Sequence, residues 1–282
     1  MVFEKTGTVS KQKFRIMKKY SFKIAVSLFA IIAVLSSCYT GPIYDPYYVP
    51  KDRQKENLYY VPSAPNTQLL TEKNDFDFNV MLSASSKFSG SEWQASFLPA
   101  KHVGIIGSYS FAVNDADQHY MKYNRFETGI GYITSISKEW HFETYAGLGT
   151  GKIDNIHATG SSKVRLTHFF LQPAIAVSNE KKTAQFAFVS KFSGVNFRPD
   201  TAFDNAREPF STSGIKSLYD KPFHVMWEPA LVFRFGWKDV LFHTSYLISA
   251  DLTNSDLYRA NNNFSIGMSL RLNASGKKSN HR

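Results

Sequence analysis

The segment RFETGIGYITSI, residues 125–136, decides the fold class of this chain. Its large apolar side chains fall at even-numbered positions, which are Phe126, Ile130, Tyr132 and Ile136. The odd-numbered positions between them carry charged or small residues, among them Glu127, Gly129, Gly131 and Ser135. A period of two residues is typical of a β-strand with one apolar and one polar face. The segment therefore predicts a strand that separates two environments.

The same alternation recurs along most of the chain. In the last such run, one face carries Phe264, Ile266, Met268, Leu270 and Leu272. We count ten runs, near residues 75–86, 91–99, 103–113, 125–136, 140–152, 163–178, 184–197, 223–236, 240–252 and 263–273. Most runs reach the roughly 9–11 residues that a tilted membrane-spanning strand requires.

The connections between the runs alternate in length. Short turns are expected at residues 99–102, 137–139, 179–182 and 236–239. Longer loops are expected near residues 114–124, 153–162, 198–222 and 253–262, and only the first connection on that side, near 87–90, is short. Such alternation is typical of outer-membrane barrels, which have short periplasmic turns and long extracellular loops. An even number of strands places both ends of the barrel on the periplasmic side.

These patterns predict an all-β fold, an antiparallel up-and-down transmembrane β-barrel of about ten strands, with eight as the alternative. The barrel is expected over residues 75–273, followed by a polar tail over 274–282. A closed barrel suits a bilayer because it leaves no strand edge without hydrogen-bond partners.

A leader precedes the barrel. Residues 1–37 combine a basic start with the apolar run from Ile24 to Leu35, which is too short for a membrane helix and typical of a signal peptide. Met17 is an alternative start. The run ends at Leu-Ser-Ser-Cys, a lipobox-like sequence, and Cys38 is the only cysteine in the chain. Because its thiol can accept a diacylglyceryl group, we expect lipidation at Cys38.

Residues 38–74 have a different character. They are rich in tyrosine and contain five prolines, which are Pro42, Pro46, Pro50, Pro62 and Pro65. Proline disfavours regular hydrogen-bonded ladders and favours an extended chain. We expect a lipidated, mostly extended periplasmic linker between the membrane and the barrel.

Charge gives little support for nucleic-acid binding. The chain carries a formal charge of +10, but the seven basic residues and one acidic residue of positions 1–37 account for +6 of it. The remaining excess is scattered and forms no basic stripe. Aromatic residues make up 15% of the chain, which suits side chains that meet lipid. The expected partner is therefore membrane lipid, at the acyl anchor and the barrel exterior, and the sequence names no extracellular or periplasmic partner.

Several segments resemble small lipidated outer-membrane β-barrel proteins of the Bacteroidetes group. The matching stretches are APNTQLLTEKNDFDF, FLPAKHVGIIGSYSF, RFETGIGY, HFETYAGLGTGK and EPALVFRFGW. The resemblance implies a β-barrel in the bacterial outer membrane. Both termini are expected in the periplasm, because the strand number is even and the lipid tether starts on that side. It implies no activity and no catalytic residue. The chain departs from many such barrels because it ends in a polar tail without a terminal aromatic residue.

The polar faces of the strands carry charges that would meet inside the barrel. A narrow barrel is filled by its own side chains, and buried charges must be paired. We therefore expect a salt-bridge network that fills the lumen, although a small pore or ligand site is the alternative. The candidates are Glu127, Glu143, Lys191, Glu228, Arg234 and Arg271.

Three functions remain open at this stage. The first is a structural or surface-interaction role carried by the extracellular loops, with no cofactor, metal site or catalytic residue. The second is a hydrolase with a loop-borne acid and histidine site, built from Asp115, Asp117, His119, Asp154 and His157. The third is a tethered soluble barrel of the lipocalin kind, which would have an apolar interior and a polar exterior.

Overall fold

The computed structural model describes residues 58–67, 69–70, 72–116, 119–157, 160–202, 218–237, 239–253, 257 and 259–273. The predicted signal peptide, Cys38, the first part of the linker and the polar tail lie outside these residues. No helix in the described part of the chain is long and apolar enough to cross a membrane.

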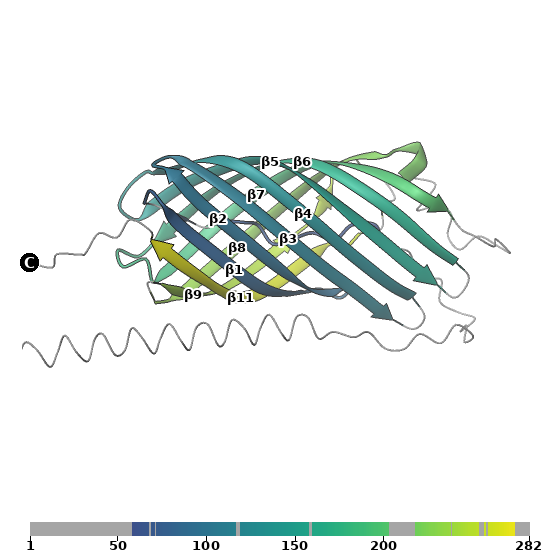
Figure 1. Cartoon of the computed structure of the whole chain (residues 1–282), viewed down its shortest axis with the longest axis horizontal. Coiled ribbons are helices and arrows are strands. Elements are labelled where there is room, and N and C mark those ends of the chain that lie inside the picture. Colours follow the sequence, from purple (N-terminus) through teal and green to yellow (C-terminus); the bar gives the residue numbers. More distant parts are fainter. Residues whose placement is uncertain are drawn as a thin grey trace, which may run out of the picture. The chain divides into compact units, whose positions relative to one another are not determined.

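The described strands form one antiparallel sheet that closes on itself (Figure 1). They are β1 (Asp75–Ala84), β2 (Ser89–Ala100), β3 (Val103–Ala116), β4 (His119–Ser135), β5 (Trp140–His157), β6 (Gly160–Ser178), β7 (Ala184–Ala202), β8 (Phe223–Gly236), β9 (Val240–Ile248), β10 (Ala250–Asp251) and β11 (Asn262–Asn273).

Closure occurs where the first and last strands meet. β1 pairs with β11 from Asp75↔Asn273 to Ala84↔Phe264, and β9 pairs with both β11 and β8. β9 and β10 pair in succession with β8, so together they make one strand of the wall. The wall therefore has ten strands in up-and-down order, which confirms the predicted fold class.

Two of the predicted long loops are instead continuations of strands. The hairpin of β3 and β4 stays paired as far as Ala116↔His119, and that of β5 and β6 as far as His157↔Gly160. The polar residues of 114–124 and 153–162 suggested loops, but a paired strand can carry polar side chains on both faces where it leaves the membrane. These four strands, together with β7, which stays paired with β6 as far as Ser162↔Ala202, therefore project well beyond the other strands on the side of the long connections. We call that side the loop rim and the opposite side the turn rim.

The outer face of the barrel is an apolar belt. Along β4 and at the residue after it, the outward side chains Phe126, Ile130, Tyr132 and Ile136 are 51%, 61%, 50% and 64% exposed. These residues cover ten residue steps, which at about 3.3 Å per residue and a tilt of about 40° span roughly 25 Å of membrane thickness. The belt continues around the wall through residues such as Trp93, Ile105, Leu148, Phe169, Phe188, Leu231 and Ile266.

The belt ends where the longer strands project. Toward the loop rim the outward positions become charged, and Arg165 of β6 forms a bidentate ion pair with Asp200 of β7 at 2.5 and 2.7 Å. Lys152 and Asp154 of β5 pair at 3.0 Å. An apolar outer belt and a polar interior are the reverse of a soluble lipocalin-like barrel, so the structure contradicts that alternative.

The belt predicts a depth-dependent cost for charge on the outer face. Ile130→Arg would place a cation near the middle of the hydrocarbon layer and should destabilise the barrel by about 2–4 kcal/mol. Asn124→Arg, on the same face of β4 beyond the belt, is the matched control and should have little effect. Denaturant unfolding in lipid vesicles, followed by tryptophan fluorescence, measures both variants. Equal stability of the two variants would contradict a membrane-facing belt.

Candidate functional site, a lumen filled by the chain itself

A segment that precedes β1 lies inside the barrel. We call residues 58–70 the plug segment. Its described side chains are almost completely buried, and Leu58, Tyr59, Tyr60, Thr67 and Leu70 are at most 1% exposed. The structure therefore corrects the prediction of a periplasmic linker over residues 38–74, because at least residues 58–67 and 69–70 are part of the barrel interior.

Hydrogen bonds show the direction in which the plug segment runs. At the loop rim, Asn155 of β5 donates to the carbonyl of Leu58 at 3.1 Å. Farther in, the backbone N–H of Ala64 donates to Glu92 of β2 at 2.7 Å. Arg234, close to the turn-rim end of β8, donates to the carbonyl of Thr67. The chain then turns, and β1 begins at the turn rim, where Asp75 pairs with Asn273.

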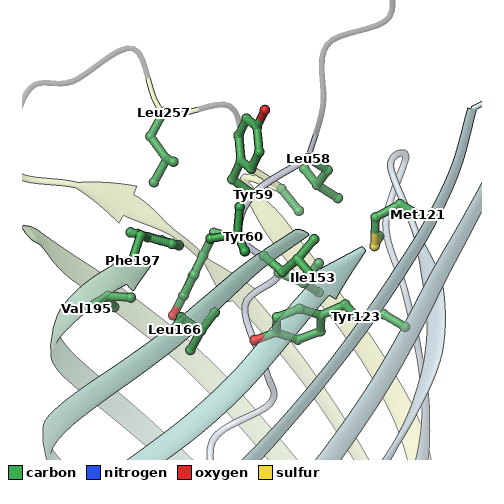
Figure 2. Close-up of a cluster of buried hydrophobic side chains, with 14 of the residues drawn as sticks. Leu58, Tyr59, Tyr60, Met121, Tyr123, Ile153, Leu166, Val195, Phe197 and Leu257 are labelled. Atoms are coloured by element: carbon green, nitrogen blue, oxygen red, sulfur yellow. The ribbon is translucent and has the colours of Figure 1, made fainter. Parts of the chain in front are cut away.

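The loop-rim end of the plug segment is anchored by a hydrophobic cluster (Figure 2). The side chains around Leu58, Tyr59 and Tyr60 come from several strands of the wall and from the connection before β11. They include Met121, Tyr123, Ile153, Leu166, Val195, Phe197 and Leu257. Tyr60 packs edge-on against Phe197, with ring centroids 6.5 Å apart. This cluster closes the lumen with apolar side chains just inside the rim.

The Tyr60 hydroxyl joins this cluster to the polar interior. It donates to Glu228 of β8 at 2.9 Å and accepts from Arg125 of β4 at 3.1 Å. The Tyr60 carbonyl accepts from the backbone N–H of Ala260 at 3.0 Å, next to an isolated parallel bridge to Arg259. Tyr60 is therefore held by side chain and backbone together.

Farther into the barrel, wall side chains satisfy the backbone of the plug segment. The Ala64 carbonyl accepts from Gln94 at 2.9 Å, and the Asn66 carbonyl accepts from Gln172 at 3.1 Å. The Pro62 carbonyl accepts from Asn263 at 2.8 Å. Buried backbone polar groups need such partners. Pro62 and Pro65 reduce this demand, because proline has no N–H to satisfy.

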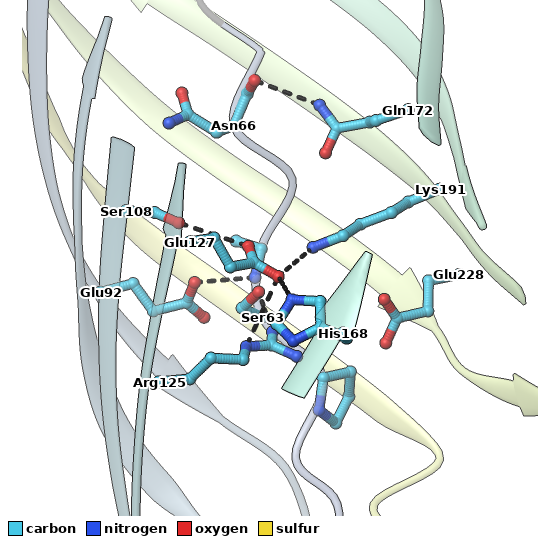
Figure 3. A network of polar contacts seen from close by, with 12 residues as sticks. Ser63, Asn66, Glu92, Ser108, Arg125, Glu127, His168, Gln172, Lys191 and Glu228 are labelled. Atoms are coloured by element: carbon cyan, nitrogen blue, oxygen red, sulfur yellow. Dashed lines mark hydrogen bonds and ion pairs between the residues drawn. The ribbon is translucent and has the colours of Figure 1, made fainter. Parts of the chain in front are cut away.

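Glu127 is the centre of the interior charge cluster (Figure 3). Its carboxylate accepts from Lys191 at 2.6 Å and from His168 at 2.7 Å, so the Nε2 atom of His168 carries a hydrogen. Arg125 lies 3.6 Å away, and Ser108 donates at 3.3 Å. Arg125 also donates to Ser63 of the plug segment. The cluster thus links four wall strands to the plug.

A second charge cluster lies toward the turn rim. Asp77 of β1 is 3.5 Å from Arg271 of β11 and 3.9 Å from Arg234 of β8. Leu69 packs nearby against the small side chains of Ala174, Ala187 and Val189. The end of the plug segment therefore rests on both polar and apolar parts of the wall.

Five of the six residues expected to form one network divide between these two clusters. Glu127 and Lys191 contact each other, and Glu228 binds the plug through Tyr60. Arg234 and Arg271 meet at Asp77. Glu143 is buried but takes part in no ion pair among the described residues.

Sequence reasoning missed Arg125, His168, Asp77 and the whole plug segment. Arg125 has the same parity as Glu127, and that signal was available. His168 and Asp77 likewise lie on the polar parity of their strands. The plug segment has no period at all, so no pattern in it indicated burial.

The residues of the hydrolase hypothesis are not brought together in the described structure. Asp154 lies on the outer face and pairs with Lys152, whereas position 157 has the opposite parity on the same strand. The side chains of Asp115, Asp117, His119 and His157 lie outside the described residues. Among the residues that are described, no group of three or more His, Cys, Asp or Glu could hold a metal ion.

No protein-family model matches the chain, and no curated protein shows significant similarity to it. Among solved structures, it is similar to the translocator domain of the autotransporter NalP from Neisseria meningitidis, with a TM-score of 0.42 and 8% identity over 72% of this chain and 90% of that one. It is also similar to the β-domain of the Bordetella autotransporter BrkA, with a TM-score of 0.40 and 10% identity over 70% and 98% of the two chains. A third similar structure is Ail, the attachment invasion locus protein of Yersinia pestis, with a TM-score of 0.34 and 10% identity over 71% and 100%. The fold assignment rests on the strand pairing of this chain itself.

The central position of Glu127 predicts a large loss of stability on neutralisation. Glu127→Gln leaves Arg125 and Lys191 buried without their counter-charge and should cost about 3–5 kcal/mol. Ser108→Ala removes only a neutral donor to the same carboxylate and should cost about 1 kcal/mol. Denaturant unfolding of the folded barrel in lipid vesicles compares the two variants. Similar losses for both would contradict the role of Glu127 as the centre of the cluster.

Proposed function

We propose that this chain is a bacterial outer-membrane barrel with a sealed lumen, whose role is structural or surface-interacting rather than transport. The observation that carries the proposal is the plug segment, which fills the interior and is hydrogen-bonded to the wall at several levels. A barrel sealed in this way offers solute no path. Its function then belongs to the parts that leave the membrane.

The loop rim is the part best suited to a partner. β3 to β7 extend past the apolar belt, and β6 and β7 present charged residues there on a paired, rigid scaffold, including Arg165, Arg198 and Asp200. Binding residues are commonly held on loops positioned by such scaffolds. This favours a macromolecular or surface partner at the loop rim.

The outer-membrane location is supported by the closed barrel, the apolar belt and the signal-like leader. We also propose that Cys38 carries an acyl anchor, as its lipobox-like context indicates. Metabolic labelling with palmitate should mark the wild-type chain and fail to mark Cys38→Ala. The barrel of that variant should nevertheless stay in the membrane, because the belt alone holds it there.

A conductance experiment tests the sealed lumen. The purified full chain, refolded and inserted into planar bilayers, should give no open-pore current. A truncated chain that begins at Thr71 lacks the plug segment, so water and ions should enter the polar interior and produce stepwise conductance. Steady current through the full chain would contradict the proposal.

The matched control for this experiment begins at Leu58. It lacks residues 1–57, which the chain that begins at Thr71 also lacks, but it keeps the plug segment. It should therefore give no conductance, like the full chain. If both truncated chains conduct equally, the upstream residues and not the plug segment would seal the barrel.

A further inference from the structure

We infer that the chain crosses the membrane once more through its own barrel, so that the residues preceding Leu58 lie on the loop side. The barrel would then hold its own N-terminal segment at the rim opposite its C-terminal strand end. This inference rests on the proposed membrane location and replaces the prediction that both termini are periplasmic.

The first step is the position of the two ends of the plug segment. Leu58 contacts Asn155, two residues from the loop-rim end of β5, and it clusters with Leu257 of the connection before β11. At the other end, the backbone N–H of Asn74 donates to the carbonyl of Leu98 at 2.7 Å, beside the turn that joins β2 to β3. The plug segment therefore runs the length of the barrel from loop rim to turn rim.

The second step is that the lumen holds a single pass. At the level of Tyr60 and Glu127, the side chains of Tyr60, Arg125, Lys191 and Glu228 are all at most 1% exposed. Protein atoms fill this cross-section, so a second stretch of chain has no room to return through it. A return outside the barrel is excluded as well, because an extended chain in hydrocarbon would leave its backbone groups without partners.

The third step concerns what lies upstream. The residues just before Leu58 read KDRQKEN, residues 51–57, a polar and mixed-charge sequence that suits water. Cys38 precedes Leu58 by 20 residues. An acyl group on Cys38 would therefore enter the leaflet on the loop side, which in the outer membrane is the outer leaflet.

Cysteine accessibility in intact cells tests this topology. Lys55→Cys places a thiol just upstream of the plug segment. Lys221→Cys places one at the loop rim, beside the start of β8, and Lys181→Cys places one in the turn between β6 and β7; both native side chains are exposed. The probe is a large polyethylene-glycol maleimide that does not cross the outer membrane, and the parent chain serves as the blank.

The inference predicts that Lys55→Cys and Lys221→Cys are labelled in intact cells, while Lys181→Cys is labelled only after lysis. Protection of Lys55→Cys until lysis, as for Lys181→Cys, while Lys221→Cys is labelled in intact cells, would overturn it. If Lys181→Cys were labelled and Lys221→Cys and Lys55→Cys were both protected, the threading would stand and the proposed orientation of the barrel would fail. The two proposals can thus fail separately.

A protease site inserted between Glu56 and Asn57 gives a second readout. Added protease should cleave the chain on intact cells without releasing the barrel from the membrane. Protection until lysis, in a barrel whose loop rim is accessible, would overturn the inference.

Discussion

A polar group inside a narrow barrel must find its partner within the protein, and this constraint organises the molecule. A ten-stranded barrel has too little internal space for bulk water, so its charged side chains cannot rely on hydration. The wall supplies acids and bases in matching positions, with Glu127 between Lys191, His168 and Arg125. Other wall side chains, among them Glu92, Gln94 and Gln172, are hydrogen-bonded to the backbone of the plug segment. Wall and plug therefore depend on each other.

The same constraint explains why an irregular, proline-containing sequence can occupy the centre of the molecule. An extended chain exposes its carbonyls on all sides, and Asn263, Gln94, Gln172 and Arg234 reach them from different strands. The two prolines remove donors that would otherwise need partners. At the loop rim, where the strands leave the membrane, aromatic rings rather than charges close the interior. The result is a seal that is apolar at the rim and polar at depth.

Much of the barrel could be predicted from the sequence, because its wall obeys a strict period. Alternation identified the strands, their faces and their number, and the parity of Glu127, Lys191 and Arg234 indicated the interior. The extension of β3 to β7 beyond the membrane could not be predicted, because outside the belt both faces are polar and the alternation disappears. The burial of the plug segment could not be predicted for a related reason. It depends on partners in many strands of the wall, and the sequence of the segment itself shows no periodic pattern that would indicate them. The contacts of Asp77 with Arg234 and Arg271 were missed because they depend on barrel closure. The pairing of β1 with β11 brings the two ends of the barrel sequence together there.

The placement of the plug segment also bears on assembly. It directly precedes β1, and the barrel closes between β1 and β11, so the wall has to close around a segment that is already present. The partners of the plug come from early strands such as β2 and from late ones such as β11, which ties its docking to complete closure. This fits a structure in which the interior is filled as the barrel forms rather than afterwards.

The central claim is that residues 58–70 occupy the lumen of the membrane-inserted barrel, and photo-crosslinking from Tyr60 tests it most directly. Benzoylphenylalanine at this position, activated in native membranes, should form crosslinks within the chain, and mass spectrometry should map them to β4, β7 and β8, around Arg125, Phe197 and Glu228. Crosslinks to lipid or to other proteins, with none to these strands, would contradict the account.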